Sequence, residues 1–184
     1  MSKVILRFSI SLDGYAAGPD VSMTAPMGIG GERLHEWMFA DRQVAEPLRV
    51  GAVVLGRRTY DIGVPHWNGD TPYPAPSFVV THRPEPRRQM KTNAFSFVTD
   101  GVHSAVSQAR AAAGDGDILV MGLATAQQIL AAGLVDDIEL QLIPVLLGGG
   151  TRLLDHLGTA SIELEQTALR EAPGVTHLAY TIRK

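Results

Sequence analysis

The sequence predicts an α/β fold built on a mainly parallel sheet. Uncharged apolar runs of the length of buried strands recur along the chain, and two of them end in a glycine that leads into a helix-like pattern. Near the C-terminus, two alternating segments surround Pro173-Gly174, which predicts a terminal antiparallel hairpin. Strands joined by helices in this order are typical of a sheet whose early strands are connected by crossovers.

Length and composition predict one domain over residues 1–184, with no second domain and no internal repeat. No apolar run is long enough to cross a membrane and no signal peptide is recognisable, so we expect a cytoplasmic protein without a membrane partner. The net charge is −3 and the basic residues are scattered, which argues against nucleic acid. The chain has no cysteine. Disulfides, thiol catalysis and cysteine-ligated zinc are therefore excluded, and we predict no metal site.

The first strand is predicted over residues 4–10, and a turn-rich segment with Gly14 and Gly18 follows it. Asp13 lies in this turn and has two interpretations. It is a candidate catalytic residue, or its side chain caps the turn, which is the commoner role of aspartate at such positions.

Residues 19–31 read as a loop, and residues 32–39 as a short amphipathic helix. Its polar face carries His35 and Glu36, which are candidate proton donors, and Trp37 is a candidate for covering a substrate ring. The alternative is a solvated face with a core aromatic residue. A second short helix is predicted over residues 43–49.

A buried strand over residues 51–55 ends in Gly56, and a helix begins directly after it. Arg57 and Arg58 stand at its start, where guanidinium groups and the helix N-terminus attract phosphate oxygens together. Two surface arginines on a solvated helix are the alternative.

Residues 62–76 read as a proline-rich loop of the kind that forms lids or binding rims, and Trp67 in it is a second candidate for covering a ring. The strand predicted over residues 77–81 ends at Thr81, and His82 and Arg83 follow just past its end. Ligands of open α/β sheets bind outside the carboxyl ends of the strands, so these residues are expected on the same rim as Arg57.

A fourth strand is predicted over residues 95–98, followed by a helix over 102–113 that Asp100 caps. The central strand, residues 118–121, ends at Gly122, and the helix over 124–132 carries Thr125 near its first turn. Free N–H groups at such a turn form an anion site that suits a dinucleotide pyrophosphate. An ordinary strand–helix turn is the alternative, and the G-x-G-x-x-G fingerprint is absent.

An alternating strand is predicted over residues 138–145, and three glycines follow it. Gly148 and Gly149 would let the backbone lie against a ring or a phosphate. A helical turn is predicted over 152–157, and the terminal hairpin pairs residues 161–170 with 175–183.

Four spaced motifs resemble the dihydrofolate reductase-like superfamily, and most closely its RibD C-terminal domain family, the reductase module of bacterial riboflavin biosynthesis and its stand-alone relatives. The motifs are Ser11-Leu-Asp-Gly-Tyr-Ala-Ala-Gly-Pro-Asp20, Val54-Leu-Gly-Arg-Arg-Thr-Tyr-Asp61, Val120-Met-Gly-Leu-Ala-Thr125 and the segment from Leu134 to Gly150. The resemblance runs from Lys3 to Lys184 and implies the three-layer fold of that superfamily. The zinc deaminase signature that often accompanies the reductase module is absent, which argues against a bifunctional enzyme.

The resemblance implies a reductase that uses NADPH on a pyrimidine- or pteridine-like substrate. It places the adenosine phosphates at Gly56, Arg57, Arg58 and Thr59 and at Thr81, His82 and Arg83; the pyrophosphate at Gly122, Leu123, Ala124, Thr125 and Ala126; and the nicotinamide by Ala16 and Ala17. The cationic rim favours a 2′-phosphate, since an acidic residue there would select NADH.

Hydride transfer also needs a proton donor, for which Asp13, His35 and Glu36 are the candidates, and residues that position the ring, for which we name Trp37, Trp67, Gly148 and Gly149. Two other functions stay open. One is a dinucleotide- or ligand-binding protein without turnover, and the other is a purely structural dimer. Relatives of the family are often dimers, so a homodimer is a possible assembly.

Overall fold

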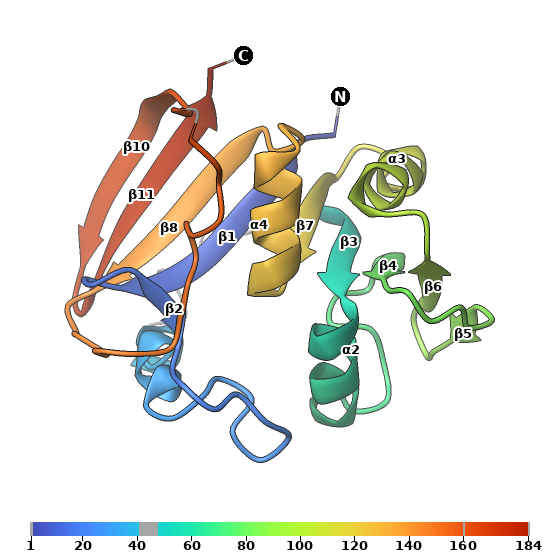
Figure 1. Cartoon of the computed structure of the whole chain (residues 1–184), viewed down its shortest axis with the longest axis horizontal. Coiled ribbons are helices and arrows are strands. Elements are labelled where there is room, and N and C mark those ends of the chain that lie inside the picture. Colours follow the sequence, from blue (N-terminus) through green and yellow to red (C-terminus); the bar gives the residue numbers. More distant parts are fainter. Residues whose placement is uncertain (1, 41–47, 160, 184) are drawn as a thin grey trace. The chain divides into compact units, whose positions relative to one another are not determined.

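The structure is a computed structural model that describes residues 2–40, 48–159 and 161–183 (Figure 1). The chain forms two compact units. Unit 1 comprises Met1–Leu6 and Leu48–Asp136, and unit 2 comprises Arg7–Pro47 and Asp137–Lys184. Strand β1 (Val4–Ser11) begins in unit 1 and ends in unit 2.

The sheet of unit 1 is parallel except at one edge. Its strands follow the order β1, β7 (Asp117–Met121), β3 (Val50–Gly56), β4 (Ser77–Val80), β6 (Ala94–Val98) and β5 (Arg88–Gln89), and only the short β5 runs antiparallel to its neighbour. Four consecutive residues of β3, from Ala52 to Leu55, are completely buried. Successive side chains of a strand point to opposite faces, so both faces of this sheet are covered. The predicted mainly parallel sheet is confirmed.

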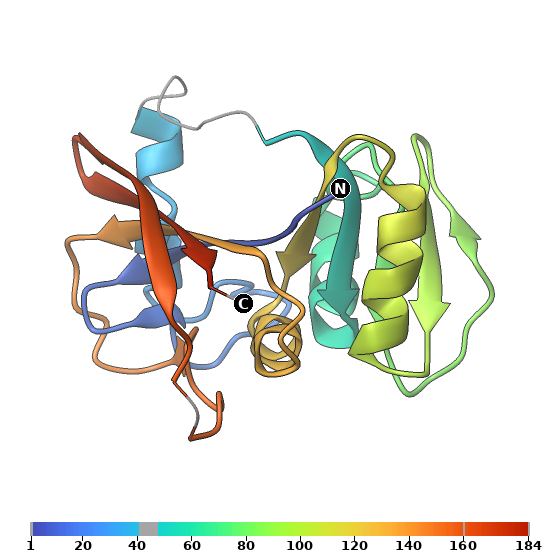
Figure 2. The same cartoon turned by 90° about the horizontal axis from the view of Figure 1, so that it is seen from above.

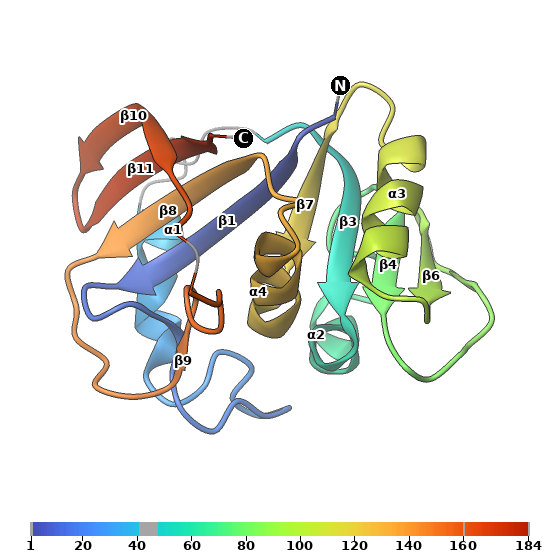
Figure 3. The same cartoon turned by 45° about the horizontal axis from the view of Figure 1, so that its top comes forward.

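Three α-helices belong to unit 1: α2 (Arg57–Gly63), α3 (Val102–Ala112) and α4 (Leu123–Ala131). Figure 3 shows α3 and α4 beside the parallel strands. In α3, Ala105, Val106 and Ala109 are buried, in agreement with the predicted helical stripe. The predicted cap at Asp100 is wrong. Gly101, with φ 93°, occupies the N-cap position. Among the described residues, no side chain forms a capping hydrogen bond with the start of this helix.

The segment predicted as a loop over residues 62–76 begins with the end of α2 and a 3₁₀ turn, η2 (Val64–His66). Tyr60 of α2 makes edge-on contacts with Phe95 and Phe97, at centroid distances of 4.9 and 5.2 Å. Trp67 stacks on Phe95 at 6.1 Å. These aromatic side chains join α2 to a core cluster on β3, β4 and β6, and this packing orders the start of the predicted loop.

The sheet of unit 2 has the order β10 (Leu164–Ala172), β11 (Val175–Ile182), β8 (Asp137–Ile143) and β1. The first three strands pair antiparallel, with Leu140 of β8 opposite Leu178 of β11. Gly174, at φ 77°, makes the tight turn between β10 and β11, which are drawn in orange to red in Figure 2. The predicted terminal hairpin is confirmed.

A second, two-stranded sheet in unit 2 corrects one prediction. Residues Thr151–Arg152 form strand β9, which pairs antiparallel with β2 (Tyr15–Ala17), in place of the start of the helical turn predicted over 152–157. The Arg152 guanidinium lies 4.5 Å from the centre of the Tyr15 ring. This cation–π contact and the backbone pairing outweigh the local helical tendency.

The helix predicted over residues 32–39 is broken into a 3₁₀ turn, η1 (Gly31–Leu34), and a single α-turn, α1 (Trp37–Ala40). Leu34 and Trp37 both pack against Ile143 and Val175 in the core of unit 2. Tertiary packing of these two side chains replaces a continuous helix. Most of the second helix predicted over 43–49 falls on residues 41–47, which lie outside the described part of the chain.

In the described part of the chain, we find no helix that is both long enough and apolar enough to span a membrane.

Candidate functional site

Two strand–glycine–helix turns lie side by side in unit 1. Strand β3 ends at Gly56 and leads into α2, and β7 is followed by Gly122 and α4. The two strands pair in parallel with Leu55 opposite Met121, so their glycines follow at the same edge of the sheet. Gly122 has φ 87°, a conformation that favours glycine, whereas Gly56 has φ −82°. Both turns were predicted from the sequence.

The two turns pack reciprocally through threonines that the sequence places third in each helix. A Cβ added to Gly56 would lie 2.4 Å from the hydroxyl oxygen of Thr125 in α4. A Cβ added to Gly122 would lie 2.2 Å from the hydroxyl oxygen of Thr59 in α2. Each turn therefore needs glycine because the threonine of the other helix occupies the space. The helix N-termini are consequently adjacent.

These adjacent N-termini have the features of an anion site. Among the described residues, no side chain caps either helix through a hydrogen bond. The first N–H groups of a helix have no intrahelical acceptor and carry the positive end of its dipole. Leu123, Ala124 and Ala126, predicted to hold a pyrophosphate, belong to the first turn of α4. Helix N-termini of this kind are common binding sites for phosphate oxygens.

Arg57, at the start of α2, forms ion pairs with two carboxylates. Its Nε donates to Asp61 at 2.8 Å, four residues further along the helix, and its Nη1 donates to Glu85. Burial works against the charge of Arg57, but the bonds to Asp61 and Glu85 outweigh it and raise its pKa. Asp61 could have been found from its i,i+4 spacing. Glu85 was missed, because only the fold brings its loop to α2.

Thr81, His82 and Arg83 follow directly after β4, the parallel neighbour of β3. Thr81 is buried, and its hydroxyl oxygen accepts the backbone N–H of Arg83 at 3.0 Å. The Arg83 guanidinium reaches Asp61 at 3.4 Å. The expected placement of this strand end beside Arg57 is therefore confirmed, because both arginines contact the same carboxylate. Arg58 also lies on the first turn of α2.

In unit 2, Asp13 holds two loops together. Its carboxylate oxygens accept the backbone N–H groups of Leu147, at 3.1 Å, and Gly148, at 2.8 Å. A hydrogen bond from Ser11 and these backbone bonds lower the Asp13 pKa from 3.8 to about 2, although desolvation opposes them. Asp13 therefore binds backbone N–H groups, as the capping interpretation expected, but they belong to the glycine-rich loop. In its own turn, the Ser11 hydroxyl oxygen accepts the Tyr15 N–H at 2.9 Å.

The fold requires glycine at some positions of the glycine-rich loop, residues 148–150, and not at others. A Cβ added to Gly150 would lie 2.0 Å from the Ala17 carbonyl oxygen, and Gly150 has φ 123°. Gly148 also has a positive φ, of 70°. At Gly149, an added Cβ would meet nothing within 4 Å among the described residues, and its φ lies outside the left-handed region. Neither backbone strain nor packing therefore explains glycine at position 149.

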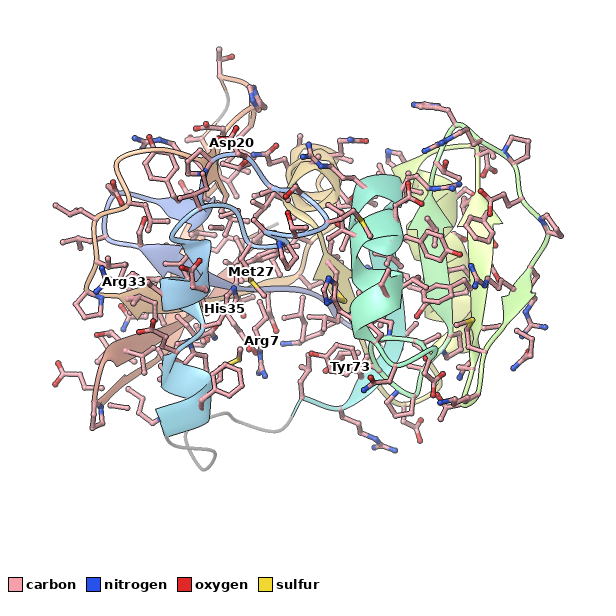
Figure 4. All side chains as sticks on the ribbon, turned by 90° about the horizontal axis from the view of Figure 1, so that it is seen from below. Arg7, Asp20, Met27, Arg33, His35 and Tyr73 are labelled. Carbon is pink, nitrogen blue, oxygen red and sulfur yellow. The ribbon has the colours of Figure 1, made fainter. Side chains whose placement is uncertain are left out.

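Ala16 and Ala17 lie on β2, and Ala17 is buried against the Gly150 backbone. Figure 4 shows His35 on the segment that joins η1 to α1. Burial lowers the pKa of His35, so its imidazole is neutral at neutral pH. The Glu36 side chain is exposed. The geometry of unit 2 therefore leaves the assignment of a proton donor open among His35, Glu36 and solvent.

The two tryptophans proposed to cover a substrate ring both pack in cores. Trp37 is only 9% exposed, and its Nε1 donates to the Ser9 hydroxyl at 3.1 Å. Its ring edge also meets His177 at 5.1 Å. Trp67 packs against Gly63, where an added Cβ would come within 2.1 Å of its ring. Packing explains both residues, and contact with a substrate stays a prediction.

The sequence profile of the RibD C-terminal domain matches residues 2–178 of the chain. Comparison with curated proteins finds none with a matching sequence.

Solved structures with the same fold include three informative ones. A protein from Shewanella sp. PV-4 with a proposed role in riboflavin biosynthesis is 22% identical, with a TM-score of 0.75 and 99% of each chain covered. Dihydrofolate reductase from Enterococcus faecalis, complexed with NADP(H) and RAB-propyl, is 14% identical, with a TM-score of 0.61, and 99% of this chain and 97% of that one are covered.

The third structure is the diaminohydroxyphosphoribosylaminopyrimidine deaminase/5-amino-6-(5-phosphoribosylamino)uracil reductase of Thermotoga maritima, which is 10% identical with a TM-score of 0.63. The match covers 99% of this chain but only 57% of that longer protein. At these identities the structural similarities establish the fold, which is that of the dihydrofolate reductase-like proteins. Together with the profile match over nearly the whole sequence, they lead to one assignment: the chain belongs to the RibD C-terminal domain family.

Proposed function

We propose that the protein is an NADPH-dependent reductase that transfers a hydride to a pyrimidine- or pteridine-like substrate. Membership in the RibD C-terminal domain family supports a reductase-type function. The name of the Thermotoga maritima protein includes a uracil-derivative reductase, and the Enterococcus faecalis enzyme was solved with NADP(H). These neighbours give the chemical class of cofactor and substrate that we propose for this chain.

The observation that carries the proposal is the reciprocal packing of Gly56 with Thr125 and of Gly122 with Thr59. It brings two helix N-termini together at the carboxyl end of β3 and β7, whose central residues are buried, and no described side chain caps either helix. A pyrophosphate needs several converging N–H donors, and two adjacent helix starts supply them. The residues present therefore fit a dinucleotide. The backbone from Gly122 to Ala126 would hold the pyrophosphate, and Arg57, Arg58, Thr81 and Arg83 would hold the adenosine phosphate.

When bound, NADPH would supply the hydride. The chain's own residues then have to bind the ring, orient it and exclude water. In unit 2, ionised Asp13 fixes the backbone of Leu147 and Gly148, so the glycine-rich loop is held in one conformation. The open space beside Gly149 is suited to a ring that lies against the backbone. We propose that this loop contributes to substrate binding.

The protonation states of two candidate donors favour a second candidate function. Asp13, with a pKa of about 2, carries no proton at neutral pH. The lowered pKa of His35 leaves its imidazole neutral there. A protein that lacks a donor can still bind a dinucleotide, so a binding protein without turnover is the alternative. For a reductase, the proton would have to come from Glu36, from the neutral imidazole of His35 or from water.

The test is NADPH oxidation by the purified chain in the presence of dihydrofolate, of other dihydropteridines and of 5-amino-6-(5-phosphoribosylamino)uracil. We expect one of these compounds to accelerate oxidation, and Arg58→Ala to weaken NADPH binding without changing the preferred substrate. His35→Ala and Glu36→Gln then locate the donor: the variant that loses turnover while it retains NADPH affinity identifies it. Nucleotide binding without oxidation by any compound would favour the binding protein, and no binding at all would contradict both functions.

A further inference from the structure

We propose that Glu85 sets the preference of this protein between NADPH and NADH, by occupying Arg57 until a 2′-phosphate displaces it. The inference rests on the proposed function and deepens it, since it concerns the selectivity of the same site. It starts from a discrepancy with the sequence. The rim at the ends of β3 and β4 was expected to be cationic, but the structure places two carboxylates on it.

The four side chains that ion pairs join at this rim carry no net charge, and Arg58 lies on the same first turn of α2. Arg57 pairs with Asp61 and with Glu85, and Arg83 pairs with Asp61. Two positive and two negative charges therefore neutralise one another where the resemblance places the adenosine phosphate. An arriving phosphate dianion meets this neutral cluster, and it gains Arg57 as a full partner only if a carboxylate gives up its place.

The two carboxylates are not equivalent. Asp61 accepts the Nε–H of Arg57 from the same helix, at i,i+4 spacing. It also forms an ion pair with Arg83. Glu85 binds Nη1, one of the two terminal nitrogens of the fork, and comes from the segment between β4 and β5. A phosphate that binds the fork end-on, through both terminal nitrogens, needs Nη1. Glu85 is therefore the carboxylate that a phosphate would replace, while Asp61 can keep its bond.

Arg57 itself would stay in place during this exchange. Its guanidinium carbon lies 5.5 Å from the centre of the Tyr60 ring and 5.8 Å from that of Phe97. Its side chain is only 19% exposed, against 37% for Glu85. Aromatic contacts and the Asp61 bond hold the guanidinium, whereas Glu85 is the more exposed partner. Arg57 is thus already oriented for a phosphate, and Glu85 is the anion that the phosphate would replace.

NADPH and NADH differ only in the 2′-phosphate, so competition from Glu85 weakens the binding of NADPH and not that of NADH. Glu85→Gln keeps the shape of the side chain and removes its charge. Because exposed ion pairs are individually weak, we expect this variant to lower the dissociation constant for NADPH by a modest factor, about threefold to tenfold. The dissociation constant for NADH should stay within about twofold.

The experiment titrates wild type, Glu85→Gln and the control Glu171→Gln with NADPH and with NADH, following nicotinamide fluorescence. Glu171 is an exposed residue of β10 in unit 2, so its substitution removes the same charge without touching the rim. The same comparison with adenosine 2′,5′-bisphosphate and 5′-AMP isolates the phosphate from the nicotinamide.

We expect the affinity ratio of NADPH to NADH to rise in Glu85→Gln and to remain unchanged in Glu171→Gln. A parallel gain for both nucleotides, or an equal gain in the two variants, would mean that Glu85 acts through overall charge and would overturn the inference. If wild type binds NADPH and Glu85→Gln leaves the ratio unchanged, the inference fails while the proposed function stands. If no variant binds either nucleotide, both fail.

Discussion

The hydroxyl oxygen of Thr125 fills the space that a side chain at Gly56 would need, since a Cβ there would lie 2.4 Å away. A glycine after one strand is thus required by a threonine on the helix that follows the neighbouring strand. The reverse relation holds between Gly122 and Thr59. In unit 1, the two helix N-termini can therefore lie close together because each glycine leaves room for the threonine of the other helix. This packing does not depend on a ligand.

Gly56→Ala should destabilise the protein by about 1–3 kcal/mol, because the added methyl group overpacks the contact with Thr125. The backbone adds no strain of its own, since Gly56 has φ −82°. Thr125→Ala removes the obstructing hydroxyl, so the double variant should be more stable than the sum of the single changes predicts. Urea unfolding of the four proteins measures this coupling. Strict additivity would show that the contact is not what requires glycine.

Gly122→Ala is the contrasting case. Its φ of 87° strains any side chain, so Thr59→Ala should recover only the part of the loss that comes from the clash. A residual cost of about 1–3 kcal/mol is expected from this backbone conformation alone, with φ 87° and ψ 130°. Thermal and urea unfolding of the single and double variants provide the measurement. Complete recovery by Thr59→Ala would show that strain at this turn is negligible.

Asp13 should make the stability of the protein depend on acid. The pKa of its carboxyl is lowered from 3.8 to about 2 by its hydrogen bonds to Ser11 and to the backbone of Gly148 and Leu147. Its stabilising contribution is therefore complete above pH 4 and is lost as the pH falls from there towards 2. Asp13→Asn should be less stable than wild type at pH 6, and the difference should shrink as the pH approaches 2. A constant difference across this range would contradict the assignment.

Gly149→Ala and Gly150→Ala separate a functional glycine from a structural one. Alanine at 150 meets the Ala17 carbonyl and a φ of 123°, so this variant should lose stability. Alanine at 149 meets open space, so its melting temperature should stay within a few degrees of wild type. If the loop contacts substrate as proposed, Gly149→Ala should raise KM severalfold with unchanged folding. An unchanged KM would remove Gly149 from the substrate site.

Trp37→Phe should act through the core and not through a substrate. Phenylalanine leaves the Ser9 hydroxyl without the Nε1 donor and opens a small cavity beside Ile143 and Val175. A loss of about 1–3 kcal/mol is expected. The free energy of unfolding should fall, with KM changed by less than about twofold. A large rise in KM at unchanged stability would instead support the ring-covering role.

The elements that could be predicted from the sequence are those that depend on interactions between residues close together in the chain. Strands β3 and β7 were predicted because both of their faces are buried, which leaves an uninterrupted apolar run. The segment Thr151–Arg152 was misjudged because its conformation depends on pairing with β2, more than a hundred residues earlier. Local patterns report what a residue prefers, and distant pairing can override that preference.

The candidate site shows the same division. Arg57 and Thr125 stand out locally, each directly after a strand and a glycine. Glu85 does not, because its contact with Arg57 arises from the adjacency of β3 and β4 and from the course of the segment after β4. Trp37 was assigned to a binding role because an aromatic residue beside polar ones fits either a site or a core. Its burial and its bond to Ser9 show that it packs in a core, and contact with a substrate stays a prediction.

The most direct test of the central claim is a titration of the purified protein with NADPH and with NADH, repeated with Arg57→Ala and Arg58→Ala. We expect saturable NADPH binding that at least one substitution weakens by about tenfold or more, with a much smaller effect on NADH. Thermal unfolding with and without NADPH controls for folding, because a bound ligand stabilises the native state. Failure of the wild-type protein to bind either nucleotide would contradict the account and would leave the family and the fold without a cofactor.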